Sequence, residues 1–129
     1  MNDHEAKSTK ATLPTGAAAR KSIPIMTGVM DYFPDAIAEV AILSRIGNDQ
    51  HNPGQVMHWA KDKSTDHANC IMRHAIERGT RDPIDKVRHS TKLAWRALAL
   101  LQRELDAEVA AKGSWTPSGE DEPGKIVTS

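Results

Sequence analysis

The sequence has only one cysteine, Cys70, and no apolar run that approaches the length of a membrane span. A single cysteine excludes an internal disulfide framework and favours a reducing compartment. A membrane helix needs about 20 consecutive apolar residues, and the N-terminal stretch MNDHEAKSTK lacks the apolar segment of a signal peptide. We therefore expect a soluble protein of the cytoplasm.

An excess of charge of one sign is also missing, because 17 basic residues balance 17 acidic ones. A net charge of zero gives no global field that would recruit nucleic acid or an anionic membrane. Aromatic residues make up 4% and apolar residues 39% of 129 residues, so we expect one domain with a small core. Oligomerisation commonly compensates for such a core.

The composition changes at both ends of the chain. Residues 1–20 have no apolar period and are predicted to form a disordered arm, and residues 111–129, rich in Gly, Pro and Ser, a flexible tail. The domain is expected in residues 21–110. Because no alternating run of β-branched residues occurs there, the predicted fold class is all-α, a small helical bundle.

Three helices are predicted within this domain. The first follows DYFPD, with Pro34 in its first turn, and stops at Gly47. The second begins at Ser64 or Thr65, either of which can act as N-cap, and closes at Gly79. The long loop between them is expected to have a task of its own, because such loops are uncommon in compact domains.

The third predicted helix is the longest. It starts with Asp82 as N-cap and Pro83 at the first helical position. Its apolar positions repeat with heptad-like spacing, and these are Val87, Thr91, Ala94, Leu98, Leu101 and Leu105.

The second helix carries an unusual polar group. Asp66, Asn69 and Arg73 are spaced i, i+3 and i+7, so they share one face. A solvated outer face is one explanation, and a ligand site is the other. Zinc is disfavoured, since one cysteine without a C-x-x-C partner supplies too few soft ligands.

The first helix favours a ligand site. Glu39 lies in an otherwise apolar stretch, residues 36–43, with Asp35 four positions before it. A buried bare carboxylate costs several kcal/mol unless it is paired or metal-bound. The simpler alternative is a salt bridge to an arginine such as Arg73.

The metal-site hypothesis joins the two helices. Oxygen donors on facing helices suit a hard divalent ion, Mg²⁺ or Mn²⁺. The predicted ligands are Asp35, Glu39, Asp66 and Asn69. Glu39 and Asp66 are the catalytic candidates, because either carboxylate can also accept the proton of an attacking water.

The third helix offers a basic stripe of His89, Lys92 and Arg96. Basic residues on the outer face of a bundle are common, so the stripe alone means little. Opposite a metal site, however, these side chains and Arg73 would supply N–H donors to phosphate oxygens. No glycine-rich phosphate loop is present, so side chains would have to hold the phosphates.

The loop between the first two helices has groups that can bind a base or a sugar. Trp59 offers a surface for stacking, although it can equally be a core residue. The substrate-binding candidates of this loop are Asn52, His58, Trp59, Lys61 and Lys63.

Three motifs carry a resemblance to a known family. GNDQHNPG, HWAKDKSTDHANCIMRH and RHSTKLAWRALALLQ, in this order, resemble the phage dATP/dGTP diphosphohydrolase (MazZ) family, within the MazG-type all-α nucleoside triphosphate pyrophosphohydrolases. The resemblance covers about residues 25–104. It implies a homodimer or homotetramer in the cytoplasm of a bacterial host. It also implies hydrolysis of a purine deoxynucleoside triphosphate, with dGTP giving dGMP and pyrophosphate for the synthesis of 2-aminoadenine DNA.

The wider superfamily uses E-x-x-E on one helix and E-x-x-D on the next. Here the first motif reads Ala36-x-x-Glu39, with Asp35 as a substitute acid, and the second reads Asp66-x-x-Asn69. Two alternatives remain open on the sequence. One is a non-catalytic helical interaction module, and the other is the same chemistry on dATP, dUTP or a ribonucleotide.

Overall fold

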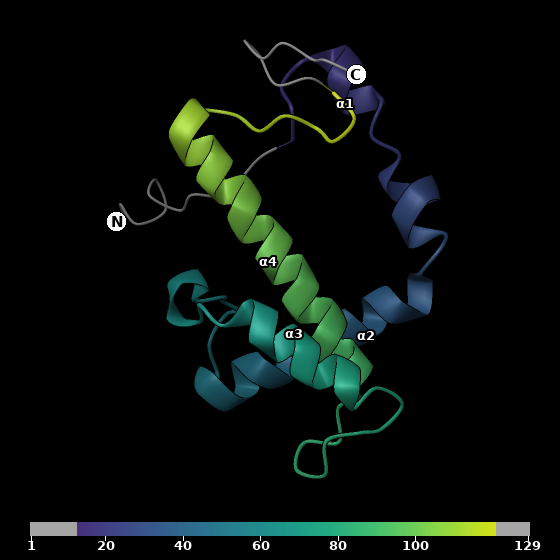
Figure 1. Ribbon diagram of the computed structural model, residues 1–129, viewed down its shortest axis with the longest axis vertical. Coiled ribbons are helices and arrows are strands. Elements are labelled where there is room, and N and C mark those ends of the chain that lie inside the picture. The colour runs from purple at the N-terminus through teal and green to yellow at the C-terminus, as the bar shows by residue number, and fades with distance from the viewer. Residues whose placement is uncertain (1–12, 121–129) are drawn as a thin grey trace. The chain divides into compact units, whose positions relative to one another are not determined.

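The computed structural model describes residues 13–120, and this part of the chain contains helices and no β-strand (Figure 1). The predicted all-α class is confirmed. The helical elements are α1 (Ala17–Lys21), the π-helical turn η1 (Met26–Met30), α2 (Pro34–His51), the 3-10 turn η2 (Lys61–Lys63), α3 (His67–Ile76) and α4 (His89–Lys112). None of these helices is long and apolar enough to cross a membrane.

The described residues fall into two compact units, one formed by residues 13–22 and 102–120 and the other by Ile23–Leu101. In the first unit, α1 is followed by Ser22, whose hydroxyl donates to the carbonyl of Ala19. Residues 1–12 of the predicted arm and 121–129 of the predicted tail lie outside the described residues. The second unit contains all of the predicted site residues.

Helix α2 begins as predicted, with Pro34 in its first turn. The predicted stop at Gly47 is wrong, because the helix continues to His51. The reason lies in the next residue: Asn48 is buried, its Nδ2 donates to the carbonyl of Gln55 (3.0 Å), and its Oδ1 accepts from the backbone N–H of His58 (3.1 Å). These bonds require a helical turn beyond the glycine, and they outweigh the roughly 1 kcal/mol that a glycine costs inside a helix.

Helix α3 is shorter than predicted at both ends. It begins after Asp66, not at Ser64 or Thr65, and it ends before Gly79, which has a positive φ of 87° in the following turn. Ser64 does not cap the helix, because its hydroxyl accepts a hydrogen bond from Arg96 of α4 (2.7 Å).

The predicted start of the third helix at Asp82 is also wrong, since α4 begins at His89. The carboxylate of Asp82 accepts from the backbone N–H of Ile84 (2.8 Å), and that of Asp85 from Val87 (3.0 Å). Such local side-chain bonds compete with helix formation. Lys86 takes a positive φ of 65°, so residues 80–89 form a hairpin instead.

Helices α2 and α3 both pack on the first half of α4 (Figure 1). On one side, the indole Nε1 of Trp95 donates to the hydroxyl of Ser44 on α2 (2.9 Å). On the other side, His74 of α3 contacts His89 near the start of α4. Arg96, further along α4, reaches the beginning of α3, so α3 and α4 run antiparallel.

Little apolar surface is buried in the described residues. The buried apolar side chains are Cys70, Val87 and Ala99, and the buried polar ones are Asn48, His67, His89 and Thr91. The heptad-like seam is buried only at its beginning, since Val87 and Thr91 are buried whereas Leu98 and Leu101 are 50% and 51% exposed.

Candidate functional site

Glu39 lies in the second turn of α2 and is held from α4. Its Oε1 accepts a hydrogen bond from the buried hydroxyl of Thr91 (2.9 Å), and Nε of Arg88 lies 3.4 Å from the same oxygen. The arginine that pairs with Glu39 is therefore Arg88 and not Arg73, the partner suggested from the sequence. The other oxygen, Oε2, accepts no hydrogen bond from a described residue, and the side chain is 40% exposed. Asp35, one turn earlier on the helix, is exposed.

Asp66, Asn69 and Arg73 form a second polar group at the start of α3. Asn69 Nδ2 donates to Asp66 Oδ1 (2.8 Å), and Arg73 Nη2 lies 3.6 Å from Asp66 Oδ2. The same arginine donates to the thiol sulfur of Cys70 (3.1 Å). The contacts between these side chains agree with the predicted common face.

The predicted metal ligands do not meet in one chain. Residues 13–120 contain no group of three or more His, Cys, Asp or Glu side chains that could hold an ion. The donors lie in two separate places, with Asp35 and Glu39 on α2 and Asp66 and Asn69 at α3. Magnesium is usually held by one or two carboxylates together with waters and substrate phosphates. Within residues 13–120 the four residues therefore do not form one cluster, and their role as ligands stays a prediction.

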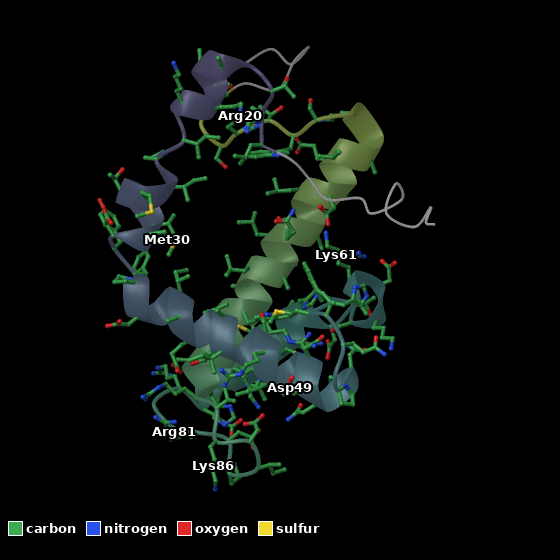
Figure 2. The ribbon with its side chains drawn as sticks, turned by 180° about the vertical axis from the view of Figure 1, so that it is seen from behind. Arg20, Met30, Asp49, Lys61, Arg81 and Lys86 are labelled. Carbon is green, nitrogen blue, oxygen red and sulfur yellow. The ribbon has the colours of Figure 1, made fainter. Side chains whose placement is uncertain are left out.

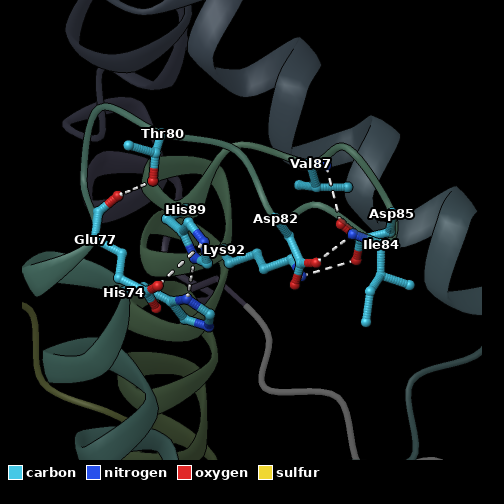
Figure 3. Close-up of polar contacts among 9 residues, drawn as sticks. All are labelled: His74, Glu77, Thr80, Asp82, Ile84, Asp85, Val87, His89 and Lys92. Carbon is cyan, nitrogen blue, oxygen red and sulfur yellow. Dashed lines mark hydrogen bonds and ion pairs between the residues drawn. The ribbon is translucent and has the colours of Figure 1, made fainter.

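Lys92 is bound to two carboxylates (Figure 3). Its Nζ lies 2.9 Å from Asp82 Oδ2 and 2.8 Å from Asp85 Oδ2. Burial tends to lower the pKa of Lys92, but its hydrogen bonds to Asp85 and Asp82 outweigh this and raise it above the ordinary value. Lys92 thus fastens the hairpin to α4, and its role as a phosphate ligand stays a prediction.

Both carboxylates have a lowered pKa. For Asp82 the backbone N–H of Ile84 is the main cause, followed by the hydrogen bond from Lys92. Burial tends to raise the pKa of Asp85, but hydrogen bonds from Lys92 and the N–H of Val87 outweigh it and lower the pKa.

His89 belongs to a histidine pair between α3 and α4. His74 Nδ1 and His89 Nδ1 lie 3.0 Å apart, and His89 Nε2 is 3.9 Å from a carboxylate oxygen of Glu77 (Figure 3). Burial lowers the pKa of His74, and the nearby charges of His89 and Lys92 lower it further. The pair is best held when at least one ring is neutral, since the bond needs one acceptor nitrogen.

Arg96 faces α3 and the loop before it. Its Nη1 donates to the hydroxyl of Ser64 (2.7 Å) and lies 3.2 Å from Nδ1 of His67. The guanidinium also lies over the ring of Trp95, 5.8 Å from its centre. Like Lys92, this predicted phosphate ligand already has protein partners.

The loop candidates are mostly held by neighbours. Trp59 packs edge-on against Trp95, with ring centres 5.5 Å apart, and Lys61 Nζ lies 5.2 Å from the centre of the Trp59 ring. Asn52 donates to Asn48 (3.3 Å). His58 and Lys63 are exposed, so they are the loop groups most available to a ligand.

A cavity of about 170 Å³ lies between α2 and the 80–89 hairpin. It is lined by Glu39, Ile42, Leu43, Ile46, Arg81, Asp85, Lys86 and Val87. Of the predicted site residues only Glu39 lines it. The sequence analysis gave no role to Arg81 and Arg88, because a helix was predicted from Asp82 where the structure has the hairpin that pairs them. It placed Thr91 in an apolar seam and so did not predict its hydrogen bond to Glu39.

Comparison with known families identifies the chain. Residues 14–112 match the family described as dATP/dGTP diphosphohydrolase, N-terminal. The chain belongs to this family. No curated protein and no solved structure matches it.

Membership of the dATP/dGTP diphosphohydrolase family makes the chain a nucleoside triphosphate pyrophosphohydrolase, an enzyme with a nucleotide substrate. The non-catalytic module considered from the sequence is therefore set aside. Diphosphohydrolases of this kind generally use divalent metal ions.

Proposed function

We propose that this enzyme hydrolyses a purine deoxynucleoside triphosphate, preferably dGTP, to the monophosphate and pyrophosphate. In this proposal it works in the cytoplasm of a bacterium infected by a phage that builds 2-aminoadenine into its DNA, and dGMP is the precursor. The family description names both dATP and dGTP, so dATP is the first alternative substrate, and dUTP the second.

The observation that carries the proposal is the position of Glu39. It is a half-exposed carboxylate that lines a cavity, and one of its two oxygens is fixed by Thr91 and Arg88. A fixed carboxylate with an accessible second oxygen suits a general base. Asp66 is the second candidate, but both of its oxygens already contact neighbours.

The proposed reaction is an in-line displacement at the α-phosphorus. Water attacks while Oε2 of Glu39 takes its proton, the bond from the α-phosphorus to the bridging oxygen breaks, and pyrophosphate leaves. Negative charge builds up on the leaving group, so cationic donors close to it lower the barrier. The loop side chains of Asn52, His58 and Lys63 are the proposed contacts for the base and sugar.

The proposed ion is Mg²⁺ or Mn²⁺, because the donor set of Asp35, Glu39, Asp66 and Asn69 consists of oxygens. Since one chain presents these donors in separate places, the complete ligand set has to include groups beyond them. The departures from the superfamily pattern at Ala36 and Asn69 reduce the negative charge available for cations.

We also propose a homodimer or homotetramer. Residues 13–120 bury few apolar side chains, while large ones are exposed on three elements of the same unit. They include Met26 and Val29 of η1, Ile42 of α2, and Leu98 and Leu101 of α4. Exposed apolar surface of this kind is typical of subunit contacts.

The test is a panel of all common nucleoside triphosphates, with Mg²⁺ or Mn²⁺ and chromatography that separates pyrophosphate release from phosphate release. Wild-type protein should form dGMP and pyrophosphate fastest from dGTP. Glu39→Gln, which keeps the shape of the side chain, should lower kcat at least about 100-fold, as removal of a general base does. Glu104→Gln, an exposed acid of α4, is the matched control and should leave turnover unchanged.

Ion binding is measured separately by thermal unfolding. An ion present at about 100 times its Kd adds roughly 2.7 kcal/mol to the free energy of unfolding.

Full turnover in Glu39→Gln would remove Glu39 as the base, and a lack of hydrolysis of every nucleotide by the wild type would remove the proposed function. Size-exclusion chromatography with light scattering checks the oligomer, which Leu98→Gln combined with Leu101→Gln should weaken.

A further inference from the structure

Two arginines lie opposite each other in the 80–89 hairpin. Arg81 and Arg88 form an isolated antiparallel bridge, and the hairpin is closed by hydrogen bonds from Asp82 N–H to the carbonyl of Val87 (2.9 Å) and from His89 N–H to that of Thr80 (3.0 Å). Residues directly opposite in an antiparallel pair have their Cβ atoms about 5 Å apart on the same face. The two cationic side chains therefore start from neighbouring points of one surface.

This pairing is unfavourable without an anion, because like charges directly opposite destabilise a strand pair. The protein supplies only one counter-charge in the described residues, Glu39, whose Oε1 lies 3.4 Å from Nε of Arg88. Arg81 has no carboxylate partner there, and its Nη1 donates to the carbonyl of Lys86 (3.1 Å). The Nη atoms of Arg88 have no described hydrogen bond, and the side chain is 55% exposed.

The arginine pair adjoins the cavity. Arg81 and Lys86 line the cavity from the hairpin, and Glu39 lines it from α2. Figure 2 labels Arg81 and Lys86 on the hairpin. Asp85 also lines the cavity, but its charge is compensated by Lys92 at 2.8 Å. Ligand pockets for whole small molecules measure roughly 300–1,000 Å³, so this cavity of about 170 Å³ fits one part of a nucleotide.

The hairpin is also held firmly in place. Lys92 of α4 ties down both of its carboxylates, Asp82 and Asp85, and Val87 is buried. Binding groups on a fixed segment lose less conformational freedom when a ligand arrives. In contrast, the predicted phosphate ligands Lys92 and Arg96 would first have to break their own contacts.

We propose that Arg81 and Arg88 bind the terminal phosphates of the substrate, at the cavity beside Glu39. This assignment rests on the proposed function, because it places the leaving pyrophosphate next to the proposed base. The guanidinium fork matches phosphate oxygens bidentately, and a polyphosphate between the two arginines removes their mutual repulsion. Lys92 has a different task in this arrangement, since it holds the hairpin and does not touch the phosphates.

Inorganic tripolyphosphate is the probe, since it contains the phosphate chain without base or sugar. Its Kd is measured by calorimetry on the full chain for wild type, Arg81→Gln and Arg88→Gln. Each substitution should raise the Kd at least about tenfold, and Arg88→Lys, which keeps the charge but loses the fork, should fall in between. Arg45→Gln is the matched control, because Arg45 is an exposed arginine of α2 outside the cavity lining.

Thermal unfolding without ligand separates binding from structure. Both Gln variants should unfold at the wild-type temperature or slightly above it, since the exposed contact to Glu39 contributes little and the repulsion is relieved. A Kd equal to that of the wild type in both variants overturns the proposal. The proposal is also overturned if a variant with a raised Kd unfolds at a lower temperature and its Kd returns to the wild-type value when binding is measured well below that temperature.

Turnover of the nucleotide panel distinguishes this proposal from the proposed function. Hydrolysis by both Gln variants with unchanged KM contradicts the role of the arginines and leaves the enzyme activity standing. A wild-type chain that hydrolyses no nucleotide contradicts the proposed function. The tripolyphosphate titration still decides the role of the arginines in that case, because it needs no turnover.

Discussion

The hydroxyl of Thr91 on α4 donates a hydrogen bond of 2.9 Å to Oε1 of Glu39 on α2, across 52 positions of the sequence. Thr91 is 6% exposed, so water does not readily replace this bond. It fixes the carboxylate relative to α4 and to Arg88, which immediately precedes that helix. Thr91 is therefore a positioning residue for the proposed general base.

Replacing Thr91 by valine tests this role. Thr91→Val keeps the branched shape and removes the hydroxyl, and it should lower kcat roughly tenfold, which corresponds to about 1.4 kcal/mol, with a smaller change in KM. Thr91→Ser restores the donor and should recover most of the rate. Steady-state kinetics on dGTP measures both, and a Thr91→Val enzyme with wild-type kcat would contradict the positioning role.

Lys92 fastens the hairpin, so its loss should destabilise the protein. Lys92→Met keeps the length of the side chain but leaves Asp82 and Asp85 without their cation, and the Tm should fall by roughly 3–5 °C, as expected for a modest loss of stability in a domain of this size. Lys86→Met removes a charge from the same hairpin and is the control, with a Tm near that of the wild type.

The effect of Lys92 should depend on pH in a defined window. The lowered pKa values of Asp82 and Asp85 give stability that is present above about pH 3.8 and is lost as the pH falls through them. The raised pKa of Lys92 gives stability that is present below pH 10.5 and is lost as the pH rises through it. The Tm difference between wild type and Lys92→Met should thus be constant between roughly pH 5 and pH 10 and shrink outside this range. A difference that persists at pH 2 would show that packing, not charge, holds the hairpin.

The histidine pair predicts a second pH dependence, at milder acidity. Because the pKa of His74 is lowered from 6.5 in the folded state, the unfolded chain takes up its proton first as the pH falls. The stability that the neutral ring contributes is present above pH 6.5 and is lost as the pH falls through the lowered value. The Tm of wild type should therefore drop between pH 7 and pH 5, and that of His74→Gln should drop less. The control is His58→Gln, which removes an exposed ring and should give the same dependence of Tm on pH as the wild type. If wild type and His74→Gln show the same dependence of Tm on pH, the histidine pair is not its cause.

Local signals in the sequence predicted the helical class and part of the boundaries. Pro34 starts α2 as its fixed φ suggests. At Asp82 the same kind of signal misled, because an aspartate side chain that bonds a backbone N–H two residues later forms a turn as readily as a cap. The helix end predicted at Gly47 was wrong for another reason. Asn48, the next residue, is held by hydrogen bonds to Gln55 and His58 of the following loop, which the sequence around the glycine does not indicate.

The site was less predictable than the fold because its contacts join distant parts of the chain. Spacing on α3 was enough to place Asp66, Asn69 and Arg73 on one face. It gave no information on Arg88, whose approach to Glu39 requires the hairpin and the crossing of α2 with α4. Nor did it show that Lys92 and Arg96 would be taken up by partners on the hairpin and before α3.

The scarcity of buried apolar side chains has a thermodynamic consequence. In the described residues, His67, His89, Thr91 and Asn48 occupy places that aliphatic groups usually fill. Heat capacity of unfolding rises with newly hydrated apolar area and falls with newly hydrated polar area. As a monomer, the protein should therefore have a flat stability curve, with a broad melting transition and a weak response to urea. In the proposed oligomer, the curvature of the stability curve would come mainly from the contact between subunits, and it would grow with protein concentration as they associate.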